Sequence, residues 1–203
     1  MNKSLVNIQA LHEPDEIVRV KNFLHRVYVV EMDWTPPEGN PSDQLTTTVN
    51  GLSVLQDRYD EVSQWFGAYS FSGQIIGCCR ICTRLDGFFE AENYKKLPGV
   101  ILQQNPLYEF NRFAVEKGQA ENMIFCGFME TIFRLALKQD FTFFSTTGMN
   151  NHEMFEKIGM RIFDQEKPFK YYPTDPNTVS FTYFMEDEKQ HILDICNKVL
   201  NSG

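Results

Sequence analysis

The sequence lacks any long apolar run, and no stretch approaches the roughly 20 consecutive apolar residues that a membrane-spanning helix requires. The N-terminal Met-Asn-Lys-Ser-Leu-Val-Asn also lacks the apolar core of a signal peptide. Basic charge is not in excess either, because 19 Lys and Arg stand against 27 Asp and Glu, for a formal net charge of −8. We therefore expect a cytoplasmic protein with no stable membrane insertion and no nucleic-acid partner.

Cysteine is scarce and unevenly placed, with three of the five residues crowded at Cys78, Cys79 and Cys82. Cys79 and Cys82 have C-x-x-C spacing, but they lie in a β-like run, where residues three apart point to opposite faces. No second Cys pair or His pair follows them. We therefore predict buried, reduced thiols and no metal site.

Aromatic residues are abundant instead, with 18 Phe and 8 Tyr in 203 residues. They indicate either an aromatic-rich core or an apolar tunnel for a chain-like ligand. The length and the hydrophobic share of 42% predict one domain over residues 1–203. Residues 33–60 have no clear periodicity and contain three prolines, which predicts a long, mobile lid in the N-terminal part.

Hydrophobic periodicity predicts strands and helices over most of the remaining chain. The expected strands cover residues 4–11, 62–71, 75–83, 107–115, 141–145, 161–164 and 179–185. The expected helices cover residues 14–32, 121–139, 150–158 and 186–200, and residues 84–106 are expected to be irregular. This order predicts an α+β fold with a mixed sheet covered by helices on both faces.

The central strand, residues 107–115, carries one ionisable residue on each face. Strict alternation puts Glu109 and Asn111 on one face, and Arg112 with Phe110 on the other. A carboxyl group among apolar neighbours has a raised pKa, which suits a general base. The alternative is that Glu109 or Arg112 belongs to a structural ion network.

Two carboxylates, Asp57 and Asp60, end the predicted lid. They form either an ordinary polar helix terminus or an acidic pair that meets Arg26, Arg80 or Arg112 and fastens the lid. Arg80 lies on a mostly apolar strand, where an arginine usually needs a partner.

Several of these residues together resemble a known family. The motifs, in chain order, are Arg26, Tyr28 and Trp34, then Asp57-x-x-Asp60, Gly77-x-x-Arg80 and Glu109-x-x-Arg112-Phe113. Their order is similar to that in the acyl-homoserine lactone (autoinducer) synthases and the long-chain N-acyl amino acid synthases. Both are built on the GCN5-related N-acyltransferase (GNAT) fold, so the resemblance, over about residues 19–160, implies a GNAT-like, mostly antiparallel sheet.

Two departures from the lactone synthases bear on the acceptor. The arginine Arg26 stands two residues before the aromatic Tyr28, where those enzymes usually place it four before, and Asn111 occupies a position usually taken by Ser. These departures favour an acceptor other than a homoserine-type molecule.

The resemblance implies transfer of an acyl chain from a thioester to the amine of an amino-acid-like acceptor. Glu109, through a water, would take a proton from the acceptor ammonium, and backbone N–H groups of splayed central strands would stabilise the oxyanion. No Cys or Ser lies in a recognisable nucleophile motif, which favours direct transfer.

The other motif residues would build the substrate site. Arg26, Arg80 and Arg112 with Asp57 and Asp60 would form an ionic cluster around the acceptor cleft, and one of the arginines would bind the acceptor carboxylate. The resemblance also implies contacts from four further residues. Tyr28 and Trp34 would line the acceptor cleft, whereas Ser145 and Thr147 would contact the acyl chain near its carbonyl.

The donor is expected to be carried by a protein. Acetyl-CoA-dependent GNAT members have an Arg/Gln-x-x-Gly-x-Gly/Ala turn after the central strand, whose N–H groups hold pyrophosphate. Residues 116–122 here, Glu-Lys-Gly-Gln-Ala-Glu-Asn, contain one glycine and two acids. This favours the acyl-phosphopantetheine of acyl carrier protein as donor, with no other cofactor.

Acyl carrier protein is acidic and would dock on basic residues. The expected contacts are Arg134 and Lys138, with Lys95 and Lys96; the alternative is that these residues are ordinary solvated side chains.

Four functions remain open at this point. The favoured one is an N-acyl amino acid synthase, such as an N-acyl tyrosine synthase. The others are an acyl-homoserine lactone synthase that uses S-adenosylmethionine, an acetyl-CoA-dependent GNAT acetyltransferase, and a non-catalytic acyl-binding module.

Overall fold

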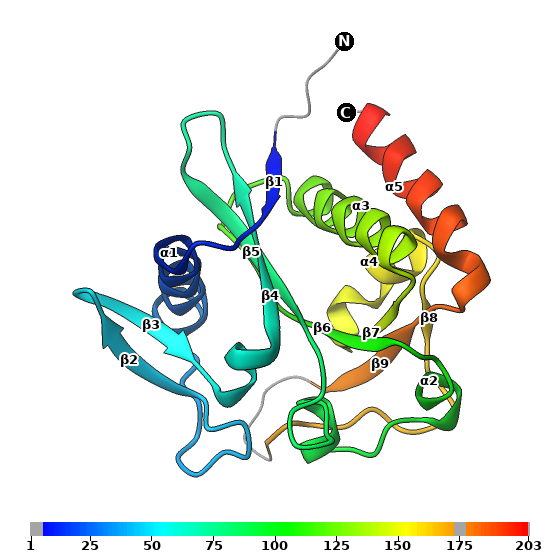
Figure 1. Cartoon of the computed structure of the whole chain (residues 1–203), viewed down its shortest axis with the longest axis horizontal. Helices are drawn as coiled ribbons and strands as arrows, with labels where there is room; N and C mark the ends of the chain where they lie inside the picture. Colours follow the sequence, from blue (N-terminus) through cyan, green and yellow to red (C-terminus); the bar gives the residue numbers. More distant parts are fainter. Residues whose placement is uncertain (1–5, 173–177, 203) are drawn as a thin grey trace.

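The computed structural model describes residues 6–172 and 178–202. At its centre lies a seven-stranded sheet with the order β1-β4-β5-β6-β7-β9-β8 (Figure 1). Neighbouring strands are antiparallel except β6 and β7, which run parallel. The strands are β1 (Asn7–Ala10), β4 (Ser63–Tyr69), β5 (Ile75–Cys82), β6 (Leu107–Val115), β7 (Thr142–Gly148), β8 (Arg161–Ile162) and β9 (Val179–Tyr183). The predicted mixed, mostly antiparallel sheet is confirmed; residues 4 and 5 of the first expected strand lie outside the described residues.

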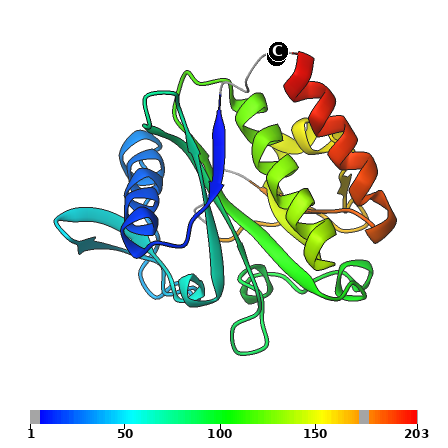
Figure 2. The same ribbon diagram turned by 45° about the horizontal axis from the view of Figure 1, so that its top comes forward.

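Helix α1 (Pro14–His25) covers one face of the sheet (Figures 1 and 2). Pro14 suits the first helical position, and the acidic first turn complements the helix dipole. Phe23 and Leu24 of α1 pack with Trp65 of β4 and Cys78 of β5. The helix continues as a π-helix over Arg26–Glu31, so the predicted helix is confirmed over nearly its whole length.

Helices α3 (Glu121–Gln139) and α5 (Lys189–Ser202) cover the opposite face (Figure 2). Phe128 and Phe133 of α3 pack there with Phe110 of β6 and Phe143 of β7, together with Phe155 of the short helix α4 (His152–Lys157). Helices on both faces were therefore predicted correctly. Among the described residues, none of the helices has the length and apolarity needed to cross a bilayer.

The prediction that residues 33–60 form a long connection without regular structure is wrong, whereas the mobility of this lid stays a prediction. These residues contain the hairpin β2 (Leu45–Val49) and β3 (Leu52–Gln56), followed by a 3-10 helix over Arg58–Val62. The hairpin turn is Asn50-Gly51, with φ values of +51° and +79°, which is the residue pair that a two-residue hairpin turn favours. The Asn22 side chain of α1 donates to the Ser53 carbonyl at 2.7 Å, which fastens the hairpin to α1.

Two more short elements lie in the segment between β5 and β6, which was expected to be irregular. These are a 3-10 helix over Ala91–Asn93 and helix α2 (Gly99–Leu102). Phe89 and Ile101 of this segment pack with Phe144 of β7 and Phe181 of β9, on the sheet face that α1 also covers. This second apolar cluster and the α1 cluster flank the middle of that face.

Strand β6 contains a bulge, and the predicted alternation fails there. Cys78 of β5 pairs with Ala114 and Arg80 pairs with Asn111, so β6 has one extra residue between the two pairs. Arg112 has a φ of +56°, in the left-handed region. The bulge turns Arg112 to the face of Glu109 and Asn111, instead of the opposite face that strict alternation predicts.

The bulge lies where the two central strands separate. β6 pairs with β7 only from Leu107 to Phe110, opposite Thr142 to Ser145. Beyond this, β6 remains paired with β5 and β7 with β9. The backbone of β6 beyond Phe110 therefore has no ladder partner in β7.

Candidate functional site

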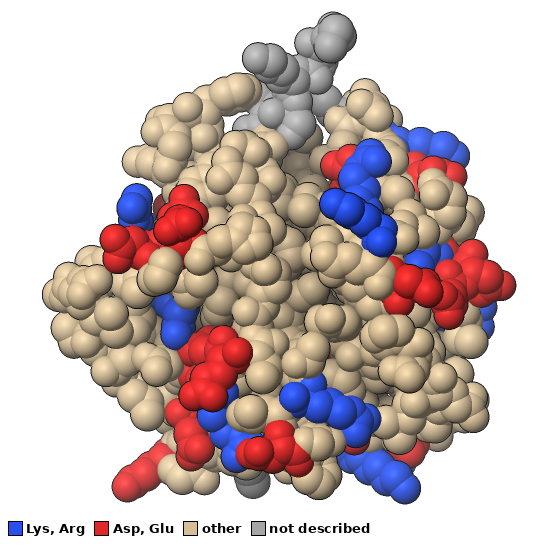
Figure 3. All heavy atoms as spheres, viewed as in Figure 1, with Lys and Arg blue, Asp and Glu red and all other residues tan. Residues whose placement is uncertain are grey.

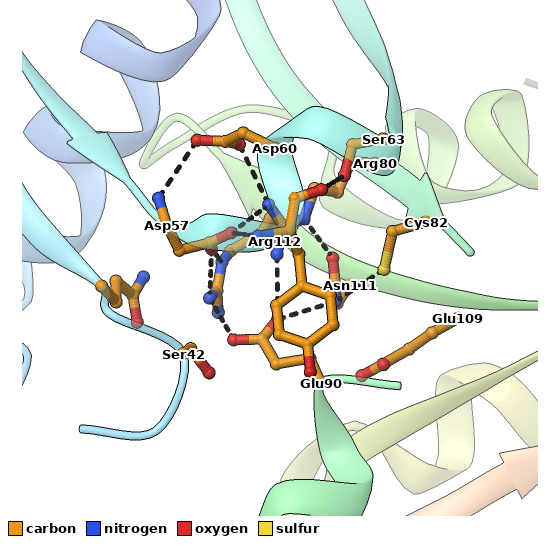
Figure 4. Close-up of polar contacts among 12 residues, drawn as sticks. Ser42, Asp57, Asp60, Ser63, Arg80, Cys82, Glu90, Glu109, Asn111 and Arg112 are labelled. Atoms are coloured by element: carbon orange, nitrogen blue, oxygen red, sulfur yellow. Dashed lines mark hydrogen bonds and ion pairs between the residues drawn. The ribbon is translucent and has the colours of Figure 1, made fainter. Parts of the chain in front are cut away.

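A cluster of charged side chains lies on the α1 face of the sheet, where β5 and β6 meet the loops (Figure 4). Its centre is Arg80 of β5, which is fully buried. Arg80 Nη1 donates to Asp57 Oδ1 at 2.8 Å and to Asp60 Oδ1 at 3.0 Å. Its Nη2 donates to Glu90 Oε2 at 2.9 Å, and its Nε donates to Asn111 Oδ1 at 2.7 Å. All three guanidinium nitrogens are therefore used within the cluster.

Arg112 is the second guanidinium of the cluster. Its Nη2 donates to Asp57 Oδ2 at 2.7 Å and also to Glu90 Oε1, and its Nε lies 3.2 Å from Asp57 Oδ2. Although burial alone would raise the pKa of Asp57, Arg80 and Arg112 hold that pKa well below its usual range. Among the described residues, these hydrogen bonds use Arg112 Nε and Nη2, and none is formed by its Nη1.

The two aspartates are positioned by their own turn. Asp57 caps the 3-10 helix, because its Oδ1 accepts from the Tyr59 N–H at 3.0 Å and Asp60 Oδ2 accepts from the Asp57 N–H at 3.1 Å. Lys21 of α1 adds an ion pair with Asp60 at 2.6 Å. The expected meeting of this acidic pair with arginines is confirmed for Asp57, which bonds both Arg80 and Arg112, and for Asp60, which bonds Arg80.

Arg26 does not join this cluster, which corrects the prediction. Its Nη1 pairs with Glu116 at 3.0 Å and with Glu31 at 3.6 Å, and its side chain is 45% exposed. The motif order predicted that Arg26 joins the cluster. Instead, Arg26 begins the π-helix, and its guanidinium lies at the end of β6, beside Glu116.

Glu109 lies beside the cluster and is fully buried. Its Oε2 accepts from the Ala91 N–H at 3.3 Å, whereas its Oε1 is buried and has no hydrogen-bond partner among the described residues. In Figure 4 the Glu109 carboxyl group points toward Glu90, and no dashed line joins it to any of the side chains drawn. Burial and the negative charge of Glu90 raise the pKa of Glu109 to about 8, against the opposing effects of the Ala91 N–H, Arg80 and Asn111. At neutral pH this carboxyl group is poised to exchange a proton.

Tyr28 and Trp34 lie together at the edge of the site. Their rings meet edge to face, with centroids 5.9 Å apart. The Tyr28 hydroxyl donates to the Phe113 carbonyl at 3.0 Å, just past the bulge in β6, and burial raises the pKa of Tyr28 to about 12. Tyr28 therefore remains protonated and holds the backbone of β6 where it leaves β7.

Ser145 and Thr147 lie on the other face of the sheet from Glu109. Glu109 is the register partner of Phe144, so Phe144 and Thr146 share its face, and Ser145 and Thr147 point to the α3 side. Thr147 Oγ1 there lies 3.1 Å from the Thr182 hydroxyl. If Ser145 or Thr147 contacts an acyl chain whose carbonyl lies near Glu109, that acyl chain must pass between β6 and β7.

Three features of the site were missed from the sequence: Glu90, the tyrosine Tyr171 and the hydrophobic segment that holds Glu90. Tyr171 bonds the Thr146 hydroxyl, and its ring meets that of Tyr94 edge to face with centroids 4.6 Å apart. Burial, together with the charges of Glu109 and Glu90, raises the pKa of Tyr171. The one available signal for Glu90 was an acid between Phe88-Phe89 and Ala91, in a segment without periodicity.

The four expected carrier-protein contacts differ in their surroundings. Arg134 pairs with Glu130 at 2.8 Å, and Lys95 pairs with Glu166 at 2.7 Å. Lys96 and Lys138 are exposed. On the face shown in Figure 3, basic and acidic side chains are interspersed.

A hollow of about 360 Å³ lies on the α3 face, between the first turn of α3 and α4. It lies near the ends of β6 and β7, because α3 follows β6 and α4 follows β7. Three amides, those of Asn122, Asn150 and Asn151, line it together with the acids Glu121 and Glu153. Its one lining cation, Lys157, is paired with Glu153 at 2.8 Å.

The fold is similar to several solved structures. The CoA-dependent acyl-homoserine lactone synthase BjaI, solved with SAM and isopentyl-CoA, has a TM-score of 0.68 at 14% identity, over 97% of this chain and 90% of that chain. FeeM, an N-acyl amino acid synthase from uncultured soil microbes, has a TM-score of 0.66 at 12% identity, over 91% and 92%. A GNAT-family acetyltransferase from Staphylococcus aureus Mu50 has a TM-score of 0.54 at 12% identity, over 89% and 99%.

No protein-family model and no curated protein matches the sequence. The structural likeness establishes a GNAT-like fold, and its neighbours include members of the families that the sequence motifs resemble.

Proposed function

We propose that this protein is an N-acyltransferase that moves a long-chain fatty acyl group from acyl carrier protein to the α-amine of an amino acid. The observation that carries the proposal is the buried carboxyl group of Glu109. One of its oxygens has no hydrogen-bond partner among the described residues, and Glu109 lies one residue before the last β6 residue that pairs with β7. A GNAT-like fold shared with BjaI and FeeM supports the same reaction class.

In the proposed reaction, ionised Glu109 takes a proton from the acceptor ammonium, directly or through a water. The amine lone pair then attacks the thioester carbonyl, so that a C–N bond forms and the C–S bond breaks, and the thiolate leaves and takes up a proton. Backbone N–H groups of β6 that have no ladder partner in β7 would bind the oxyanion.

Arg112 is the best candidate for the acceptor carboxylate. Arg80 is ruled out by its contacts, because each of its nitrogens already donates to Asp57, Asp60, Glu90 or Asn111. The remaining Nη1 of Arg112 lies on the face of Glu109 and offers one charge-assisted hydrogen bond. Tyr28 and Trp34 would form one wall of this acceptor cleft.

The hollow between α3 and α4 is the proposed entrance for the donor. Its amides suit the amide-rich phosphopantetheine arm, whereas Glu121 and Glu153 would repel the pyrophosphate of a CoA. This supports a carrier-protein donor, with docking on Arg134, Lys138, Lys95 and Lys96 as part of the same proposal. A cytoplasmic location follows from the use of acyl carrier protein.

A second candidate is acyl-homoserine lactone synthesis, favoured by the likeness to BjaI, which was solved with SAM. The deciding experiment incubates the protein with palmitoyl-acyl carrier protein or palmitoyl-CoA, each with an amino acid mixture or with S-adenosylmethionine. Mass analysis of the product identifies donor and acceptor together. We expect N-acyl amino acids from the carrier-protein donor; a lactone product would establish the second candidate instead.

Glu109→Gln is the matched variant for this assay. It should lower turnover by about 10²–10⁴-fold, because it removes the base but keeps the shape of the side chain. If the wild-type protein binds acyl carrier protein thioester yet forms no product with any acceptor, the protein is a non-catalytic acyl-binding module. Transfer of acetyl groups from acetyl-CoA alone would make it an ordinary acetyltransferase.

A further inference from the structure

Glu90 connects every charged or amide side chain that surrounds Glu109 on β5 and β6. Its Oε1 accepts from Arg112 Nη2, and its Oε2 accepts from Arg80 Nη2 at 2.9 Å and from Asn111 Nδ2 at 3.0 Å. The side chain is only 6% exposed. One carboxylate thus holds both arginines and the amide of Asn111, which lies two residues from Glu109 on β6.

The backbone beside Glu90 also reaches Glu109. Ala91, the next residue, donates its N–H to Glu109 Oε2 at 3.3 Å. The Asn93 side chain donates to the Glu90 carbonyl at 2.9 Å and fixes this short 3-10 turn. Because the Glu90 side chain is anchored to two strands, the Ala91 N–H is anchored with it.

Glu90 accepts from both arginines that lie on the face of Glu109. A buried carboxylate beside Arg80 and Arg112 would form an ion pair and lose its basicity. Here both arginines direct their Nη2 atoms to Glu90, and Glu109 keeps one oxygen without a partner.

We propose that Glu90 is a positioning residue that keeps Glu109 out of an ion pair and orients it for proton transfer. This inference rests on the function proposed above, and it adds a residue outside the motifs that resemble the known synthases. Glu90 acts through Glu109 and through the arginines, and it does not itself touch the reacting atoms.

Several groups face Glu109 and contribute to its charge state. Cys82 of β5 is its register partner, and the charge of Glu109 also acts on Tyr59 and Tyr171. Burial and Glu90 raise the pKa of Glu109, and Arg80 lowers it. Loss of the Glu90 charge removes a cause of the raised pKa and leaves the arginines uncompensated, so both effects lower the pKa.

The direct test measures the side-chain carboxyl resonance of Glu109 by NMR as a function of pH. The protein is labelled with ¹³C in the glutamate side chains, and Glu109→Gln assigns the signal. In Glu90→Gln we expect the midpoint of Glu109 to fall by at least one pH unit. An unchanged or higher midpoint in a folded Glu90→Gln protein overturns the proposal.

Glu92→Gln is the control from the same segment. Glu92 accepts from the Phe89 N–H at 3.0 Å and pairs with Arg84 at 3.5 Å, and it has no contact with Glu109. Its substitution should leave the Glu109 midpoint unchanged. If Glu90→Gln fails to fold, the double variant E90Q/R112Q removes one charge of each sign. A smaller fall of the midpoint is expected there, because only Arg80 is left uncompensated; no fall overturns the proposal.

The activity test separates positioning from simple structural support. The rate should rise with pH as Glu109 ionises and then level off. Glu90→Gln should move this rise to lower pH. It should also lower the rate reached at high pH, since a weaker base accepts the proton less well. Glu90→Asp keeps the charge and should restore the position of the rise. A lower rate with an unmoved rise in Glu90→Gln overturns the proposal. If the wild-type protein shows no turnover, the proposed function fails, while the NMR titration still decides the role of Glu90.

Discussion

At the scale of single residues, Glu109 couples the folding of the protein to pH. Burial and the charge of Glu90 raise its pKa in the folded protein to about 8, above the ordinary value of 4.5 for an exposed glutamate. Below pH 4.5 both the folded and the unfolded chain hold the proton, so the ionisation of Glu109 does not change the stability there. As the pH rises toward 8, the unfolded chain releases the proton and the folded chain keeps it, so stability falls.

Glu109→Gln removes this loss, because glutamine stays neutral at every pH. The free energy of unfolding of the variant, relative to wild type, should rise by about 1–3 kcal/mol between pH 5 and pH 8. Urea unfolding at both pH values measures it. A difference that is the same at pH 5 and pH 8 would show that Glu109 ionises normally in the folded protein.

The charge of Arg80 stabilises the fold, whereas the charge of ionised Glu109 destabilises it. Arg80 is fully buried and bonds Asp57, Asp60 and Glu90. Arg80→Ala leaves these carboxylates without a central partner and should lower the free energy of unfolding by roughly 3–5 kcal/mol.

The exposed Arg134 is the control for this substitution. Its side chain is 58% exposed and pairs with Glu130 within one helix, so Arg134→Ala should change stability by at most about 0.5 kcal/mol. Equal effects of the two substitutions in urea unfolding would contradict the central role of Arg80.

At the scale of elements, the contact between β5 and α3 depends on Gly77. A Cβ atom at this position would lie 3.0 Å from Ile124 Cγ2 and 3.3 Å from the Ala114 carbonyl oxygen. Gly77→Ala should therefore force α3 and β5 apart and lower the free energy of unfolding by about 1–3 kcal/mol.

Gly99 is the control for Gly77, because it begins helix α2 and a Cβ there meets no atom within 4 Å. Gly99→Ala should be neutral or stabilising by up to about 1 kcal/mol, since alanine favours a helix. Thermal unfolding of both variants is the measurement. A neutral Gly77→Ala would show that β5 and α3 adjust freely at this contact.

At the scale of the whole molecule, the single domain expected from the length stays a prediction that unfolding can test. Both tryptophans, Trp34 and Trp65, belong to the α1 side of the sheet, whereas the long helices α3 and α5 lie on the other side. Tryptophan fluorescence thus reports on the α1 side alone, whereas far-UV circular dichroism reports on all the helices, including α3 and α5. In one domain, their urea transitions should coincide; a fluorescence transition at clearly lower urea would mean that the α1 side unfolds separately.

Much of the architecture was predictable because local patterns agree with the final packing. The helix at residues 121–139 and the strands around Gly73 and at Leu107 follow from periodicity, since each buries a regular apolar stripe or face. The hairpin at residues 45–56 was missed although Asn50-Gly51 is a strong turn pair, because its strands are short and carry exposed threonines.

The candidate site was predictable only in part. Buried arginines on apolar strands require carboxylates, so a meeting of Asp57 with Arg80 or Arg112 was one of the outcomes expected from the residue types, and the structure shows it with both. Arg26 was misplaced because order along the chain does not set distance in the fold. Glu90 was missed because its segment has no regular period, and only packing brings it between the two arginines.

The sequence alone determined the class of fold and the helices on both faces of the sheet, and it indicated that the buried arginines would meet carboxylates. These follow from the burial of apolar surface and the cost of an unpaired buried charge, which act on any chain with this pattern. The tertiary structure decided that Arg112 joins the face of Glu109 and that Glu90 leaves Glu109 without an ion pair. A bulge and a loop contact set both outcomes, because strand alternation is a local rule, whereas a left-handed residue persists only where distant neighbours hold it.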